Sequence, residues 1–219
     1  MRHFAALAAA MLCLAACAAP AEAPPAVTPS SSPTVGVVNP ARVDRVRGEL
    51  PAGYEVADLI DRPTPVALWG FGPGWIAEPS QCAALADPVL DPASLRGWSA
   101  SGEGGIVYTF AAGGAAAPDP AVVDGCAAWT VTAGPTSGTV DRLDAPTVDG
   151  AITLGMGADV VTTVEGGTAT RSHADTYYAF AEGRVVVVVV VTDPGAAQSA
   201  LDAAFAADLL TKTVAALRG

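Results

Sequence analysis

From Asp159 to Val191 the chain reads DVVTTVEGGTATRSHADTYYAFAEGRVVVVVVV, the most regular pattern in its sequence. The pattern predicts a meander of three strands at Asp159–Glu165, Thr168–Phe180 and Val185–Val191, with glycine turns at Gly166-Gly167 and Glu182-Gly183. Valine is stiff at χ1 and favours extended backbone. Because the valine strand is apolar on both faces, it must be covered on both faces and lie in the interior of a sheet.

The segments around this meander predict a single α+β domain. Apolar residues recur at helical spacing from about Ala197 to Leu217, which predicts a final helix lying across the valine strand. The expected fold is an antiparallel β-sheet with a central all-Val strand, covered by this C-terminal helix and by short helices. Further strands are expected at Tyr54–Ile60, Gly97–Ser101, Ile106–Ala111, Trp129–Ala133 and Thr139–Asp144, and short helices at Arg42–Leu50, Pro79–Leu85 and Pro120–Ala127.

Composition and charge exclude two classes of protein. Of the 219 residues, 51% are hydrophobic and 15% are charged, so the chain is not generally disordered. The 22 acidic residues outnumber the 11 basic ones and give a formal net charge of −11. A surface this acidic repels phosphate backbones, so we expect no nucleic-acid partner.

The N-terminal residues predict export and lipidation. A short basic start precedes an apolar run from Phe4 to Ala16, which is too short to span a bilayer. The run ends in Leu14-Ala15-Ala16-Cys17, which matches a lipobox: small residues fit the peptidase, and the Cys thiol receives diacylglycerol. The alternative is an ordinary secretory signal with a chance cysteine. We therefore expect a signal peptide at residues 1–16 and an acylated, palmitate-bearing Cys17 at the extracytoplasmic face of the cell membrane.

Beyond the signal peptide, the sequence predicts a tether and one domain. Residues 17–36 contain the lipidated cysteine and a spacer rich in Pro, Ser and Thr, and residues 37–219 form the single α+β domain. Cys82 and Cys126 are the two cysteines of that domain. Outside the cytoplasm such a pair usually forms a disulfide, and two buried free thiols are the alternative.

Several segments resemble a family of mycobacterial-type envelope lipoproteins whose domain has no assigned function. These segments are Arg45–Pro51, Cys126–Trp129, Glu165–Asp175 and Ala206–Gly219. That family is remotely similar to the extracellular sensor domain of PknH-type receptor kinases, an α+β domain with a cleft and two disulfides. This chain offers one bridge in its domain, so no residue role is carried over. The resemblance implies a cell-envelope lipoprotein with a ligand groove.

One candidate ligand-binding set lies on the middle strand of the meander. Alternation places Arg171, His173, Asp175 and Tyr177 on one face. Their neighbours Ser172, Ala174 and Thr176 are small and suit packing under a helix, so the polar set is expected to point away from it. The hypothesis is a polar cleft wall for an anionic ligand, with His173 titrating near pH 6.5 unless Asp175 shifts it. The alternative is an ordinary solvent-facing strand with an Arg–Asp pair.

A second candidate set consists of three aromatic residues in a loop rich in Gly and Pro. Trp69, Phe71 and Trp75 form either a ligand platform or a plug at the edge of the core. No catalytic triad, zinc site, calcium loop or phosphate loop is recognisable, so we expect no enzyme, no metal and no cofactor.

Two classes of function are left. One is a ligand-binding or sensor-like envelope domain for a lipid, glycan or protein, and the other is a structural or protein-interaction lipoprotein without a small-molecule site.

Overall fold

The computed structural model describes residues 36–59, 63–114, 116–195 and 200–219. All of these belong to one compact unit, Thr34–Gly219. The predicted signal peptide, the lipid site Cys17 and nearly all of the tether lie outside the described residues. Within the described ranges, no helix combines the length and the apolar character needed to cross a bilayer.

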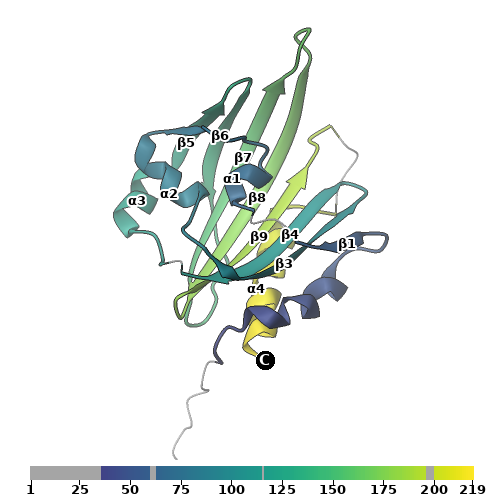
Figure 1. Ribbon diagram of the computed structural model, residues 1–219, viewed down its shortest axis with the longest axis vertical. Helices are drawn as coiled ribbons and strands as arrows, with labels where there is room; N and C mark the ends of the chain where they lie inside the picture. The colour runs from purple at the N-terminus through teal and green to yellow at the C-terminus, as the bar shows by residue number, and fades with distance from the viewer. Residues whose placement is uncertain (1–35, 60–62, 115, 196–199) are drawn as a thin grey trace, which may run out of the picture. The chain divides into compact units, whose positions relative to one another are not determined.

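A nine-stranded antiparallel sheet runs through the unit (Figure 1). Its strands stand in the order β1-β3-β4-β9-β8-β7-β6-β5-β2. Their bounds are β1 Glu55–Asp58, β2 Ile76–Glu78, β3 Asp91–Gly102, β4 Gly105–Gly113, β5 Ala128–Ala133, β6 Thr136–Leu143, β7 Ile152–Thr163, β8 Ala169–Ala181 and β9 Arg184–Thr192. The antiparallel sheet expected from the sequence is confirmed.

The valine strand β9 pairs with β4 on one side and with β8 on the other. Val185 to Val190 are all buried. Side chains alternate between the faces of a strand, so the odd-numbered valines Val185, Val187 and Val189 join one hydrophobic cluster. The even-numbered valines join the cluster on the other face. The middle strand of the nine is β8, one place from β9.

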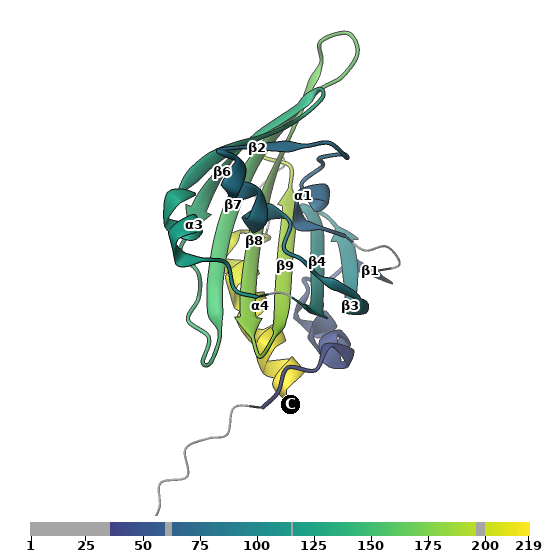
Figure 2. The ribbon, with the colours of Figure 1, turned by 60° about the vertical axis from the view of Figure 1, so that its left-hand side comes forward.

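One face of the sheet is covered by the 3₁₀ helix η1 (Pro40–Glu49) and by α4 (Ala203–Arg218), as Figure 2 shows. Trp98 Nε1 donates a hydrogen bond of 3.1 Å to the Val43 carbonyl, which joins η1 to β3. The predicted C-terminal helix is confirmed, but its predicted first residues fall partly on 196–199, outside the described ranges. The helix begins at Ala203 because Asp202 Oδ1 accepts from Phe205 N at 2.8 Å and caps it.

The other face carries several short helices and their connections (Figures 1 and 2). They are α1 (Pro65–Leu68), η2 (Ser80–Cys82), α2 (Ala83–Ala86) and α3 (Pro120–Gly125). The last three correspond to the helices predicted at Pro79–Leu85 and Pro120–Ala127. The sequence did not predict α1 and β2, because elements of four and three residues are too short to show a period.

Candidate functional site

The predicted polar set on β8 lies on the face of the sheet that α4 covers. Tyr177 is 2% exposed and belongs to the same hydrophobic cluster as Leu209 of α4. The expectation that this set points away from the helix is therefore wrong. The small residues of the opposite face pack under Trp69 and not under α4. Trp69 Nε1 donates to Thr176 Oγ1 at 2.8 Å.

His173 is held between two carboxylates. Its Nδ1 lies 2.8 Å from Asp159 Oδ1, and its Nε2 lies 3.2 Å from Asp175 Oδ1. Both ring nitrogens can donate only when the imidazole is protonated. The hydrogen bond to Asp175 is the largest cause that raises the pKa of His173 to about 9, with a further contribution from Asp159 and against the opposing effect of burial. His173 is therefore charged at neutral pH, and the shift by Asp175 that the expectation of titration near pH 6.5 allowed for applies here.

A polar hollow lies beside this histidine, on the part of the sheet face beyond α4. Its volume is about 430 Å³, and it is lined by Thr130, Thr132, Ser137, Gly138, Thr139, Asp159, Val161 and Arg171. Among the described residues, no carboxylate lies within 4.0 Å of the Arg171 guanidinium, so the alternative of an Arg–Asp pair does not apply to it. Of the predicted set, Arg171 and the edge of His173 reach solvent, whereas Asp175 and Tyr177 are buried.

The three aromatic residues of the second candidate set lie on the opposite face of the sheet from His173. Trp69 and Phe71 are 1% and 4% exposed, and Trp75 is partly buried against the same cluster. The ring of Trp69 lies 6.2 Å from that of Trp129. This packing matches the alternative in which the aromatic residues plug the core, and the structure does not bring the two predicted sets together.

An apolar trough, which the sequence analysis missed, runs along one end of the face that carries α1 to α3. It consists of three hollows of about 360, 400 and 610 Å³. The first two share Asp87, Pro88 and Val89, and the last two share Pro118 and Asp119. The other lining residues include Pro63, Leu90, Leu95, Val122, Val123, Ile152, Leu154 and Phe180. Hollows of this size and apolar lining are typical of small-molecule sites.

Two large apolar side chains in this trough are exposed to solvent. Val89 is 82% exposed and Ile152 is 61% exposed. Side chains of this kind gain about 1.5–3 kcal/mol when they are fully buried. The trough therefore offers a favourable free energy to any apolar partner that covers both of them.

The charged groups that line the trough are carboxylates. They come from Asp87, Asp119 and Asp124, and no lysine or arginine is among the lining residues. Asp119 Oδ1 accepts from Ala121 N at 2.8 Å, and Asp124 Oδ1 lies 3.4 Å from Arg142 Nη1. Burial raises the pKa of the Asp87 carboxyl. Among the described side chains, no cluster of His, Cys, Asp and Glu suited to a metal ion occurs.

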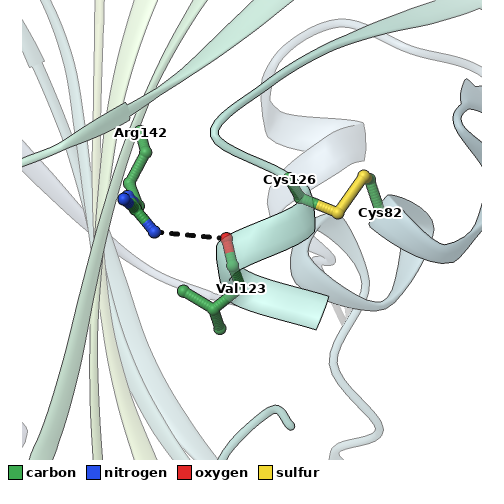
Figure 3. Close-up of a disulfide and its surroundings, with 4 residues drawn as sticks. All are labelled: Cys82, Val123, Cys126 and Arg142. Carbon is green, nitrogen blue, oxygen red and sulfur yellow. Dashed lines mark hydrogen bonds between the residues drawn. A yellow bond between two sulfur atoms is a disulfide. The ribbon is translucent and has the colours of Figure 1, made fainter. Parts of the chain in front are cut away.

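A disulfide between Cys82 and Cys126 fixes one wall of the trough (Figure 3). It links η2 to the end of α3 across 44 positions of sequence, with the two Cα atoms 5.7 Å apart. Arg142 Nη1 donates to the Val123 carbonyl at 3.3 Å and so ties α3 to the sheet. The pairing expected from the sequence is present in the structure.

The sequence does contain a signal for the trough. Three of the four Asp-Pro steps in the sequence, at 87–88, 91–92 and 119–120, contribute lining residues to the trough, and the fourth is at 193–194. Proline lacks an N–H and does not continue a helix or an interior strand, so these steps lie at the boundaries of regular elements: β3 begins at Asp91 and α3 at Pro120. Three such boundaries, together with the apolar residues beside them, mark the uncovered end of the sheet.

The fold defines an α+β domain with one antiparallel sheet, and comparison with known proteins identifies its family. A family model described as a domain of unknown function (DUF5642) matches residues 39–218. Because this match covers most of the chain, the protein belongs to the DUF5642 family.

One solved structure shows the same fold. It is the X-ray structure of an uncharacterised protein (the Rv0999 ortholog) from Mycobacterium smegmatis, which is 23% identical with a TM-score of 0.61. The similarity covers 83% of this chain and 98% of the other chain. At this identity the comparison establishes the fold alone. No curated protein matches the sequence.

Proposed function

We propose that this protein is a lipoprotein of the bacterial cell envelope whose domain binds an uncharged lipid in the apolar trough without catalysing a reaction. The observation that carries the proposal is the run of three connected hollows with Val89 and Ile152 open in it. The lipobox at Leu14–Cys17 supports location at the extracytoplasmic face of the membrane. The resemblance to a sensor domain with a cleft is consistent with a binding role.

The charge of the trough specifies the class of ligand. Its carboxylates and the net charge of −11 repel an anionic head group. A neutral head group with hydroxyls can donate to a carboxylate such as Asp87, which has no hydrogen-bond partner for its side chain among the described residues. An acyl chain fits the apolar lining. We place the ligand here rather than at Arg171 and His173 because half of that predicted set is buried.

We expect monopalmitoylglycerol to bind the unlipidated mature chain, residues 18–219, and palmitate to bind it far more weakly. Thermal unfolding measures this difference, because a ligand that binds only the folded state raises Tm. Replacing Ile152 by serine removes an apolar contact and should weaken binding by about tenfold. Since Ile152 is largely exposed, the variant should keep its stability to within about 0.5 kcal/mol.

The matched control is Val164→Ser, because Val164 is 46% exposed and lies outside the trough. Equal affinity of the two variants for monopalmitoylglycerol would exclude the trough. Equal binding of palmitate would exclude the assignment to uncharged lipids.

The other candidate function is a protein-interaction lipoprotein, and the same exposed side chains favour it. Val89 and Ile152 suit a protein interface as well as an acyl chain. The binding experiment separates the two functions: if neither lipid raises Tm while Ile152→Ser disrupts a complex with an envelope protein, the trough is an interaction surface.

The lipid anchor has its own test. Replacing Cys17 by alanine removes the thiol that accepts diacylglycerol, so we expect complete loss of labelling by radioactive palmitate in the producing bacterium. The variant should also leave the detergent phase in Triton X-114 partitioning. If the variant is labelled and partitions like the parent chain, the lipobox interpretation is wrong.

A further inference from the structure

A hollow rich in arginine lies where the chain enters the domain. Its volume is about 440 Å³, and Arg42, Arg184 and Arg218 line it together with residues 37–40. The hydrogen bond from Asn39 N to the Leu217 carbonyl, 3.0 Å long, holds the entering chain against the end of α4. The start of η1, the start of β9 and the end of α4 thus bring three of the 11 basic residues into one place.

Two of these guanidinium groups donate to backbone carbonyls. Arg42 Nη1 donates to the Leu217 carbonyl at 3.2 Å, and Arg184 Nη1 donates to the Glu182 carbonyl at 3.4 Å. Both acceptors are neutral backbone groups. Within the part of the chain that the structure describes, no carboxylate lies within 4.0 Å of either guanidinium.

Arg218 and Glu182 form the remaining charged pair at this hollow. Arg218 Nη2 lies 3.5 Å from Glu182 Oε1, and its Nη1 donates to the Asp149 carbonyl. Glu182 Oε2 also accepts from Val38 N at 2.8 Å. The hollow is thus lined by three positive groups with one carboxylate paired to one of them, in a chain whose net charge is strongly negative.

The strand pairing shows where the arginine hollow lies relative to the apolar trough. Arg184 pairs with Gly113 of β4 and with Ala181 of β8, and Phe180 of the trough pairs with Ile152. The arginine hollow and the apolar trough therefore lie at the same end of the sheet, on its two faces. Arg171 lies on β8 ten residues before Ala181, which at 3.3 Å per residue is about 33 Å away.

We propose that this end of the domain docks on the surface of a bilayer that contains anionic phospholipid, with lipid phosphate groups held in the arginine hollow. Arginine binds phosphate through paired N–H donors. Residues 17–36 attach directly to this end, so an anchor at Cys17 keeps the hollow at a high effective concentration near lipid. In this orientation the trough opens close to the membrane that supplies its ligand. This inference rests on the proposed envelope location, but not on the identity of the trough ligand.

The test uses the unlipidated chain of residues 18–219, which contains both hydrophobic clusters, and co-sedimentation with vesicles. We expect binding to vesicles of phosphatidylcholine with phosphatidylglycerol, loss of binding at high salt, and no binding to phosphatidylcholine alone. Arg184→Gln should weaken binding by about fivefold, the contribution typical of one basic residue near an anionic surface. Arg184→Glu should abolish it.

Arg171→Gln is the matched control, because it removes the same charge at the far end of β8. Arg171 is exposed and Arg184 is half-buried, and neither guanidinium has a carboxylate partner among the described residues, so circular dichroism is expected to show unchanged folding for each variant. Equal losses from Arg184→Gln and Arg171→Gln would overturn the docking surface and leave only a general charge effect. Absence of vesicle binding, with inorganic phosphate still bound through Arg184, would also overturn it and indicate a small-anion site.

Discussion

Replacing Cys82 and Cys126 together by alanine is expected to lower the free energy of unfolding by about 4 kcal/mol. The bridge closes a segment with a sequence separation of 44, and a cross-link over that length removes roughly this much chain entropy from the unfolded state. Both cysteines are almost fully buried, and neither contributes a charge. Urea denaturation of the oxidised parent and of the double variant measures the difference as a shift in the unfolding midpoint.

The reduced parent chain is the control for this prediction. Unfolding it in the presence of dithiothreitol should give the same midpoint as the double variant, because both lack the cross-link and keep nearly the same core. If the reduced parent unfolds at the midpoint of the oxidised one, the bridge contributes nothing. A loss confined to the trough, with the sheet equally stable, would show instead that the bridge fixes only α3.

The sheet could be predicted because the strand patterns of its central strands extend over many residues. β8 and β9 contain 13 and 9 residues, and their alternation and valine content exceed any competing helical period. The first seven residues of β7 and the first six of β3 were not predicted. Gly155 and Gly157 dilute the apolar pattern of β7, and Pro92 with the bulge before Arg96 interrupts β3.

Asp159, one of the two partners of His173, was not predicted because the predicted pairing of β7 with β8 was wrong by one residue. A two-residue turn at Gly166-Gly167 would place Asp159 opposite Ala174. In the structure β7 ends at Thr163 and β8 begins at Ala169, so the loop is longer and Asp159 stands opposite His173. A shift of one residue exchanges the two faces of a strand. The length of the turn, which the sequence specifies weakly, thus determines whether the pair of Asp159 and His173 can be predicted.

The apolar trough could not be predicted because it exists only where no other part of the domain packs on its apolar side chains. Val89 and Ile152 have the composition of core residues, and nothing local distinguishes an exposed valine from a buried one. The Asp-Pro steps show where regular structure stops, but the shared walls come from segments about 30 residues apart in sequence, such as Pro88 and Pro118. Their proximity follows from the sheet order.

The stability of the His173 cluster should depend on pH. In the folded state the pKa of His173 is about 9, against 6.5 in the unfolded chain. The folded state therefore binds the proton more tightly, so the stabilisation is fully present below pH 6.5 and is lost as the pH rises through about 9. His173 is the sole histidine after His3, and the two bonded cysteines do not titrate, so few other side chains change charge in this window.

His173→Gln should cost about 1–2 kcal/mol of stability at pH 6 and almost nothing at pH 10. The rise in pKa sets an upper limit of about 3.4 kcal/mol, and a third of the His173 side chain is exposed to solvent, which screens the pair and reduces this value. The cost exceeds that of an ordinary surface change, because the Asp175 side chain is 7% exposed and depends on the histidine. Urea unfolding at a series of pH values measures it.

Two variants of the carboxylates test the cause of this dependence. Asp175→Asn removes the largest cause of the raised pKa, so the loss of stability above pH 6.5 should be smaller and should be complete at a lower pH than in the parent. Asp159→Asn is the matched control, because it deletes the same charge from a side chain that is 68% exposed, and its effect should be smaller. If the parent and His173→Gln lose stability in parallel from pH 6.5 to 9, the histidine is not charged by its neighbours. In that case it titrates as an ordinary surface residue, and Arg171 is the sole fixed cation of the polar hollow.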